Sequence, residues 1–266
     1  MRRQSVLWIS FGILFILLLV SVWGSLPWRA PTPPLSAPYL HYRLADHPKY
    51  HETPLHHVYA FHLLKPGTCR GFVNAIEAYA EQNGGWTTKR HSSYPTTDIP
   101  IKSTPLWPSV ESVVRDRVFP ILAQAYGFEK RYLSIRDLFF VKYDADTPGA
   151  QKHLKFHRDG TLLSFNILCN PRSEFDGGGT MFEALGNTVV DPQACGDLVI
   201  HSGKLRHSGA AITRGRRYLI VGFVNVSDPD VNNNLLQRNR NSIKSIELDY
   251  MLTTSTVSMK KIKKIK

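Results

Sequence analysis

Apolar residues recur with a helical period in the first half of this chain and with a strand period in the second. Two stretches show the helical spacing: Pro66–Ala80, which is followed by Gly84-Gly85, and Val110–Tyr126, which is followed by Gly127. Proline at the start and glycine just past the end are typical helix boundaries. Both stretches are therefore predicted helices.

Short runs rich in β-branched and aromatic residues are separated by Gly, Pro, Asp and Asn, which is the pattern of strands. One run, Val58–Leu64, precedes the predicted helices. The others follow them: Leu138–Tyr143, Leu162–Cys169, Gly179–Leu185, Asp197–Gly203 and Arg217–Val226.

Helices followed by many short, evenly spaced strands favour an α+β fold in which the helices pack on a β-sandwich or jelly roll. No internal repeat is present. At 266 residues the chain is long enough for one sizeable domain with appendages. We assign that domain to residues 55–228 and predict a polar, then basic, tail at 229–266.

An uncharged run of 18 residues, Val6–Trp23, follows Arg2 and Arg3 near the N-terminus. This length nearly spans a bilayer and exceeds the apolar region of most signal peptides, so residues 1–26 are predicted to be a cytosolic stub and a signal-anchor transmembrane helix. The arginines favour a cytosolic N-terminus. Residues 27–54, rich in proline, are a predicted lumenal stalk. We expect a single-pass type II membrane protein of the endoplasmic reticulum or Golgi with its domain in the lumen.

The formal net charge is +12, but seven of these charges lie at the chain ends, which leaves +5 for the body. No basic helix with interleaved aromatic residues appears in the body. We therefore expect no nucleic-acid partner.

Three cysteines, Cys69, Cys169 and Cys195, are too few for a disulfide framework, and their spacing matches no zinc motif. In a lumenal setting one pair, with Cys169 and Cys195 as the first candidates, could form a disulfide. The third is expected to be buried and free.

The main chemical signal is the segment KFHRDG at residues 155–160. In an extended strand, positions i and i+2 point to the same face, so His157 and Asp159 converge while Arg158 points away. A 2-His-1-carboxylate iron site needs this pair and one distant histidine. Alone the pair is weak evidence, because a solvated His and Asp near a turn would look the same.

A third ligand and an anchor for an acid follow downstream. His207 precedes Arg217 by ten residues, and Arg217 begins a strongly apolar strand. An arginine that enters a core needs a carboxylate partner, and the distal carboxylate of 2-oxoglutarate is suited to it. A salt-bridged arginine at the rim of the sandwich is the alternative. His201 is the rival third ligand, but position 211 is Ala211, so we place His201 outside the metal site.

These motifs resemble the catalytic domain of procollagen lysyl hydroxylases, within the prolyl and lysyl 2-oxoglutarate/Fe(II) dioxygenases. The resemblance extends over residues 55–228. The segments that carry it are GGWTTKRH, YPTTDIPI, FFVKY, HRDGTLLSFNILCN, GGGTMF and HSGAAITRGRRYLIVGFV. It implies a double-stranded β-helix.

The resemblance also implies roles for individual residues. It implies Fe(II) ligation by His157, Asp159 and His207, and binding of the 2-oxoglutarate C5 carboxylate by Arg217. Further cosubstrate contacts are implied for Tyr143, Asn166 and Arg90. L-ascorbate is implied as the reductant of the iron.

The expected function is hydroxylation of a C–H bond on a protein, at lysine first and proline second, with release of succinate and CO2. An oxygenase acting on a small molecule or glycan is an alternative. From another class, the alternative is a catalytically inactive lumenal jelly-roll module that binds a ligand or partner. The chain lacks the glycosyltransferase portion of animal lysyl hydroxylases and differs from them in loop lengths, which affects the expected substrate more than the chemistry.

Overall fold

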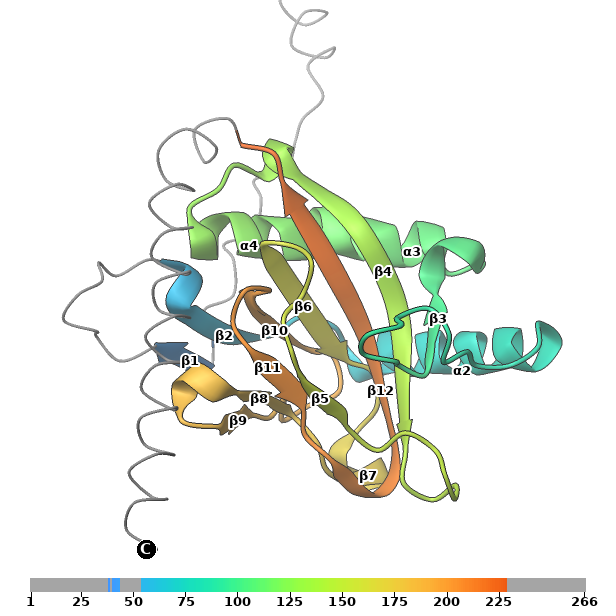
Figure 1. The fold of residues 1–266 in the computed structure, drawn as a ribbon. Coiled ribbons are helices and arrows are strands. Elements are labelled where there is room, and N and C mark those ends of the chain that lie inside the picture. Colours follow the sequence, from blue (N-terminus) through green and yellow to red (C-terminus); the bar gives the residue numbers. More distant parts are fainter. Residues whose placement is uncertain (1–37, 39, 44–53, 229–266) are drawn as a thin grey trace, which may run out of the picture. The chain divides into compact units, whose positions relative to one another are not determined.

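A computed structural model describes residues 38, 40–43 and 54–228 (Figure 1). The predicted membrane anchor, most of the predicted stalk and the predicted tail lie outside these residues. No helix in the described part of the chain is both long and apolar enough to cross a membrane.

Two antiparallel sheets form the domain, and every strand pair in them is antiparallel. The larger sheet contains, in spatial order, β1 (Leu40–Arg43), β2 (His57–His62), β10 (Asp197–Ser202), β6 (Leu163–Leu168), β12 (Ile212–Val226), β4 (Leu133–Asp144) and β3 (Asp98–Pro100), with β7 (Phe175–Gly177) paired to β12. The smaller sheet has the order β5 (Leu154–His157), β11 (His207–Gly209), β8 (Thr180–Phe182) and β9 (Thr188–Val190).

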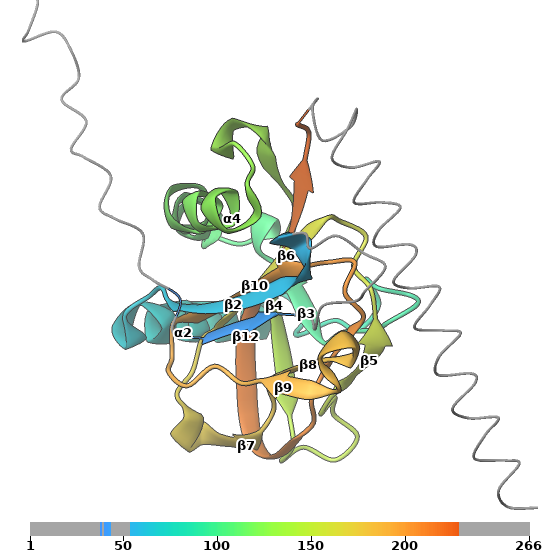
Figure 2. The same ribbon diagram turned by 90° about the vertical axis from the view of Figure 1, so that its left-hand side faces the viewer.

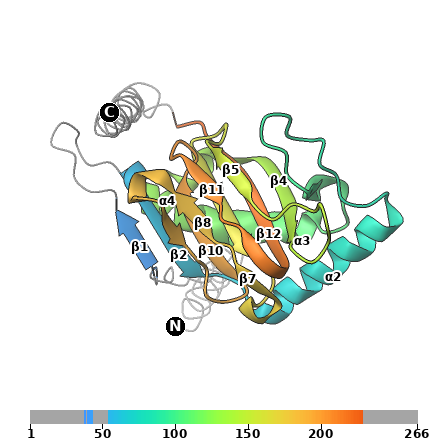
Figure 3. The ribbon, with the colours of Figure 1, turned by 60° about the horizontal axis from the view of Figure 1, so that its bottom comes forward.

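The helices lie against one face of the larger sheet, and the smaller sheet lies against the other (Figures 1, 2 and 3). Strands β6 and β10 are buried at every residue, as expected of strands covered on both faces. Apolar residues from the two sheets pack together, for example Val58 and Val199 against Phe182. This arrangement, mostly antiparallel sheet with few helices, is consistent with the predicted jelly roll.

The predicted helices are present, with one difference. Helix α2 (Pro66–Gln82) buries a stripe of Cys69, Phe72, Ile76 and Ala80. The second predicted helix is divided into α3 (Trp107–Val113), a π-helical turn (Val114–Val118) and α4 (Phe119–Tyr126), which ends at Gly127 in the left-handed region with φ of 75°. The π turn places both Val114 and Val118 in the core, and the apolar period alone does not reveal such an insertion.

Strand boundaries differ from the predicted ones at several ends. The predicted strand Gly179–Leu185 is a strand only over Thr180–Phe182 and continues as a 3₁₀ turn at Glu183–Leu185. The last strand begins at Ile212 instead of Arg217. Four further 3₁₀ turns are found at Pro54–His56, Ile101–Ser103, Lys130–Tyr132 and Arg172–Glu174.

No disulfide joins any of the three cysteines, so the Cys169–Cys195 bridge that the sequence left possible is not formed. All three thiols are free and buried, and Cys69 of α2 interacts with both of the others. Hydrogen bonding to Cys169, together with burial, raises the pKa of the Cys69 thiol to about 12. The cysteines thus behave as small apolar side chains between α2 and the sheet.

Helix α2 is attached to the outer face of the larger sheet through Glu77. Its carboxylate accepts hydrogen bonds from Lys142 of β4 at 2.8 Å, from the hydroxyl of Tyr218 of β12 at 2.5 Å and from the indole of Trp86 at 3.2 Å. Partial burial favours the protonated acid, but these donors outweigh it and hold the pKa of Glu77 below its ordinary value of 4.5.

We predict that Glu77→Gln lowers the free energy of unfolding by about 1–3 kcal/mol, because three donors lose a charged acceptor. Since the folded-state pKa of Glu77 is lowered, its contribution is present above pH 4.5 and is lost as the pH falls below that value. Urea unfolding at pH 7 and pH 4 measures both effects.

Glu129→Gln is the matched control, because the Glu129–Arg131 pair is largely exposed and should leave the unfolding midpoint unchanged. Equal effects of the two substitutions, or a gap between wild type and Glu77→Gln that widens in acid, would contradict the role assigned to Glu77.

Candidate metal and cosubstrate site

The two histidines predicted as metal ligands face each other across a strand pair. In the ladder between β5 and β11, His157 is the direct partner of His207. The next pair, Gly209 with Leu154, shows a register shift, so β5 contains a bulge. A bulge lets Leu154 and His157 both point into the space between the sheets although they are three residues apart.

Each imidazole is oriented by its own backbone. The Nδ1–H of His157 donates to the carbonyl of Lys155, and that of His207 donates to the carbonyl of Leu205, both at 2.8 Å. This hydrogen bond fixes the tautomer, and the Nε2 lone pair remains available. In both residues Nε2 faces Asp159.

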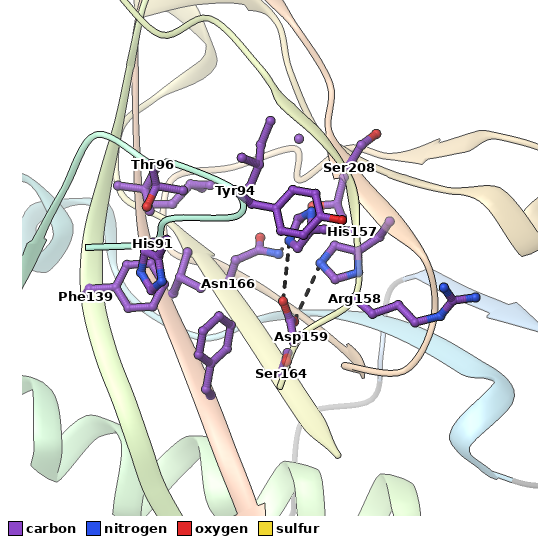
Figure 4. A pocket seen from close by; sticks show the side chains of 18 of the residues that line it. His91, Tyr94, Thr96, Phe139, His157, Arg158, Asp159, Ser164, Asn166 and Ser208 are labelled. Atoms are coloured by element: carbon purple, nitrogen blue, oxygen red, sulfur yellow. Dashed lines mark hydrogen bonds and ion pairs between the residues drawn. The ribbon is translucent and has the colours of Figure 1, made fainter. Parts of the chain in front are cut away.

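Asp159 completes the cluster just beyond the end of β5. Its backbone N–H donates to the carbonyl of Gly203 at 2.8 Å, which holds the residue in place. Its carboxylate lies 3.4 Å from Nε2 of His157 and 3.6 Å from Nε2 of His207, whereas Arg158 points away (Figure 4). The three donor atoms lie within 4.8 Å of one another.

Burial and charge set the protonation states that a metal site needs. Burial lowers the pKa of His207 to about 3, so this imidazole is neutral at physiological pH. Burial alone would raise the pKa of Asp159, but the adjacent His207 and His157 outweigh it and hold this pKa well below its usual range. Two imidazole nitrogens and one carboxylate form the donor set of a non-haem Fe(II) site.

The distances also fit a metal ion. In an octahedral site with bonds of roughly 2.1 Å, neighbouring donors lie about 3 Å apart. The observed 3.4 and 3.6 Å go to different oxygens of Asp159, and one donor atom from each residue lies within 4.8 Å of the others, so the side chains would move inward to bind an ion.

Arg217 is almost fully buried, with 1% of its surface exposed. It makes no ion pair with any described residue; Nη1 donates to the carbonyl of Gly179 at 3.4 Å, and Nη2 has no hydrogen-bond partner there. Burial lowers the pKa of Arg217, although Tyr143 and Asp191 oppose this shift. A buried guanidinium with an unused donor is unfavourable unless a carboxylate joins it, so this position fits one end of a diacid.

Tyr143 and Asn166 lie in the same cavity as Arg217 and the histidines. Tyr143 is the ladder partner of Arg217, and its ring centroid is 5.8 Å from the guanidinium carbon. Asn166 donates to the hydroxyl of Thr180 at 3.3 Å, while its Oδ1 has no partner among the described residues. A Cβ atom at position 209 would lie 2.6 Å from the Tyr143 hydroxyl, which explains the glycine there.

The cavity has a volume of about 360 Å³, a size usual for small-ligand sites. Arg217 and Tyr143, which are almost fully buried, line this cavity together with His157, Asp159 and His207, of which His157 is partly exposed. Along the inner face of β4 and β12, apolar pairs follow the Arg217–Tyr143 pair: Leu219 with Val141, then Val221 with Phe139. The cavity therefore contains a buried positive charge, an apolar wall and three side chains that could hold a metal ion.

Arg90 lines the cavity, but its guanidinium is already paired. It donates to Asp98 at 2.8 Å and to Asp137 at 2.7 Å, and it lies over the ring of Phe139. Desolvation opposes the charged form, but Asp98 and Asp137 outweigh it and raise the pKa of Arg90. The direct cosubstrate contact implied by the resemblance stays a prediction.

His201 lies beside the cluster without joining it. Its ring centroid is 4.5 Å from that of His207, and its Nδ1–H donates to the carbonyl of Ser202 at 2.9 Å. Burial lowers its pKa, so it is a neutral neighbour. This agrees with its expected place outside the metal site.

Several cavity residues were not predicted from the sequence, among them Tyr94, Thr180 and Ser208. Tyr94 and Ser208 flank the metal cluster in Figure 4. Tyr94 lies in a loop, where no periodicity reports which way a side chain points. Thr180 follows three glycines with positive φ. That run of glycines in the sequence could have indicated an unusual backbone at this point of the site.

Comparisons with known proteins agree with the resemblance found in the motifs, although no protein-family model matches the chain. The chain is 29% identical over 186 residues to the multifunctional procollagen lysine hydroxylase and glycosyltransferase of Rattus norvegicus, covering 65% of this chain and 24% of that protein. It is 28% identical over 185 residues to procollagen-lysine,2-oxoglutarate 5-dioxygenase 2 of Homo sapiens, with the same coverage. With the procollagen lysyl hydroxylase and glycosyltransferase of Acanthamoeba polyphaga mimivirus it shares 30% identity over 177 residues, or 63% of this chain and 19% of that one.

The chain thus spans about a quarter of the length of these relatives or less. Similar solved structures include a viral collagen prolyl hydroxylase from Paramecium Bursaria Chlorella virus-1, with a TM-score of 0.46, 14% identity and coverage of 63% and 94% of the two chains. A Pseudomonas putida prolyl-4-hydroxylase has a TM-score of 0.46, 15% identity and coverage of 64% and 93%. The sequence similarities support a lysyl hydroxylase-like 2-oxoglutarate/Fe(II) oxygenase domain, and with it Fe(II) and 2-oxoglutarate.

We predict that His207→Ala weakens Fe(II) binding by more than about 100-fold, because it removes one of three donors, whereas His201→Gln weakens it by about tenfold or less. Anaerobic titration calorimetry with Fe(II) measures both. Similar losses in the two variants would mean that His201 shares in metal binding and would contradict the assignment.

Proposed function

We propose that this chain is a 2-oxoglutarate- and Fe(II)-dependent dioxygenase that hydroxylates a C–H bond of a protein, at a lysyl or, second, a prolyl residue. The observation that carries the proposal is the shared cavity. A buried cluster of two imidazoles and a carboxylate opens into the same cavity as a buried guanidinium that has no ion pair among the described residues. The relatives' names, which describe procollagen lysine hydroxylases, support a protein substrate.

The charges of the residues that line the cavity support Fe(II) and 2-oxoglutarate as its ligands. Of the charged residues that line the cavity, Asp159 supplies one negative charge beside the two imidazoles and Arg217 one buried positive charge. The other two are arginines with partners outside the cavity: Arg90 pairs with Asp98 and Asp137, and Arg158 donates to the carbonyl of Lys204. A divalent cation at Asp159 makes that end net positive, and a dicarboxylate then meets a positive charge at each of its ends. The filled cavity carries no net charge from the cation, the dicarboxylate, Asp159 and Arg217, which is the favourable condition in a low-dielectric interior.

The side chains have separate tasks in the proposed reaction. His157, Asp159 and His207 would hold Fe(II) on one face and leave its other positions open. Arg217 and Tyr143 would bind the C5 carboxylate of 2-oxoglutarate, and the amide of Asn166 would orient its other end. O2 is the oxidant: with Fe(II) and 2-oxoglutarate bound, one of its oxygen atoms would enter the hydroxylated product and the other the succinate that 2-oxoglutarate yields with loss of CO2. The apolar side chains of Val141 and Leu219 would exclude water from the part of the cavity that 2-oxoglutarate occupies.

Further parts of the proposal come from the family and the N-terminus. L-ascorbate, typical of such enzymes, would restore Fe(II) after unproductive turnover.

The apolar run Val6–Trp23 supports a type II anchor with a lumenal domain in the endoplasmic reticulum or Golgi. Membrane flotation and protease protection of the full chain in microsomes would test this topology.

The direct test of the enzyme is succinate release by the full chain with Fe(II), 2-oxoglutarate, ascorbate and a peptide library. We predict that wild type releases succinate and that His157→Ala does not, because the variant loses a metal ligand. Equal release by both proteins, or none from either, would favour a binding module without catalysis.

We predict that Arg217→Gln raises the KM for 2-oxoglutarate about 100-fold, because a buried carboxylate loses its charged partner. Arg214→Gln is the control, since Arg214 pairs with Asp176 at the surface and should leave this KM unchanged. A competition binding assay between 2-oxoglutarate and 2-oxobutyrate, which lacks the distal carboxylate, tests the same contact directly. Wild type should prefer 2-oxoglutarate strongly and Arg217→Gln should not; an unchanged preference would exclude Arg217 as the anchor.

A further inference from the structure

The segment between α2 and β3, residues 86–97, forms one wall of the cavity mouth. Arg90, His91, Tyr94 and Thr96 from this segment line the cavity. Figure 4 shows Tyr94 beside His157, with His91 and Thr96 nearer to Phe139. The two ends of the segment meet in a bridge in which the backbone N–H groups of Thr87 and Asp98 each donate to the other residue's carbonyl, at 3.2 and 2.8 Å.

Two side chains fix this wall from opposite sides. Arg90 is held by the fully buried Asp98 and by Asp137 of β4. Gln151, from the β4–β5 connection, accepts a hydrogen bond from the Thr97 N–H at 2.6 Å and donates to the carbonyl of Pro95 at 3.0 Å. The stretch between these attachments, which includes Tyr94, is therefore held in a defined position.

Tyr94 occupies an unusual place for an aromatic side chain. It is 40% exposed, and no other large hydrophobic residue in the described part of the chain is comparably exposed. Its ring centroid lies 5.3 Å from that of His157, at an interplanar angle of 37°. One part of the ring thus contacts a metal-ligand imidazole while another part faces the cavity mouth.

A fixed, half-open aromatic ring beside a reactive centre is a common means of binding a partner. Tyrosine offers a large contact area and loses little conformational freedom, and it is enriched where binding energy is concentrated. The ring next to His157 would be close to any group that reaches the metal from the mouth. It carries no charge, so it favours carbon-bound hydrogen over carboxylates.

On this basis, and resting on the proposed function, we propose that Tyr94 is a substrate-binding residue that packs on the aliphatic carbons of the peptide side chain undergoing hydroxylation. Arg90 and Gln151 are its positioning residues. The methylene stem of a lysyl residue and the ring of a prolyl residue both present such carbons.

The test measures KM values for peptide and for 2-oxoglutarate with the full chain. Two synthetic probes, a Gly-X-Lys repeat and a Gly-Pro-Pro repeat, distinguish the two sources of aliphatic carbon. Tyr94→Ala should raise the KM for the accepted peptide about tenfold or more, while the KM for 2-oxoglutarate changes less than about twofold. Tyr94→Phe keeps the ring and should restore the wild-type KM for peptide.

Two further variants separate binding from general damage. Tyr132→Ala removes a partly exposed tyrosine that does not line the cavity and should leave both KM values unchanged. Gln151→Ala should raise the peptide KM in the same direction as Tyr94→Ala, by a smaller factor, because it loosens the wall.

The outcomes distinguish this inference from the proposed function. An unchanged peptide KM in Tyr94→Ala, or equal rises in both KM values, overturns the role of Tyr94. A wild type that releases succinate but responds to neither peptide overturns the peptide substrate and this inference with it. Failure of wild type to release succinate under any condition overturns the proposed function itself.

Discussion

The pairing of β5 with β11 at one register, His157 opposite His207, is the constraint on which the site depends. Strand side chains alternate between faces, so a slip of one residue would turn one imidazole toward solvent. The register is supported on both sides of β11, because β11 also pairs with β8, where Phe182 is opposite His207 and is fully buried. Core packing between the sheets thereby sets the relative positions of the side chains of His157, Asp159 and His207.

A second constraint is electrostatic. The sheets bury Arg217 and Asp159 at different places in one cavity, and neither forms an ion pair with the other. A structure optimised only for stability would place apolar side chains at these positions. Some folding stability is thus given up to bury two opposite charges apart from each other, and the proposed cation at Asp159 and diacid at Arg217 would give each of them a partner.

Local patterns predicted much of the fold and of the site. Strand periodicity and the i, i+2 rule brought His157 and Asp159 to one face, and the ten-residue interval between His207 and Arg217 singled out the third histidine. Partners that come from distant segments could not be predicted in this way. The two carboxylates on Arg90 belong to β3 and β4, and the position of Tyr94 depends on Gln151, far along the chain. Sequence spacing left a disulfide possible, because it does not report whether two thiols lie in bonding geometry, and in the structure all three thiols are free.

The attachment of Glu77 has a consequence for how the cavity responds to its surroundings. Lys142 and Tyr218, which Glu77 binds on the outer face, are the immediate chain neighbours of Tyr143 and Arg217 on the inner face. Helix α2 thus holds, from the outer face, the rung of the ladder next to the one that carries Arg217, the proposed diacid anchor, on the inner face. A ligand or substitution that shifts helix α2 would move Lys142 and Tyr218, and through them the adjacent Tyr143 and Arg217. Binding at the outer surface of the domain could therefore change the affinity for the proposed cosubstrate.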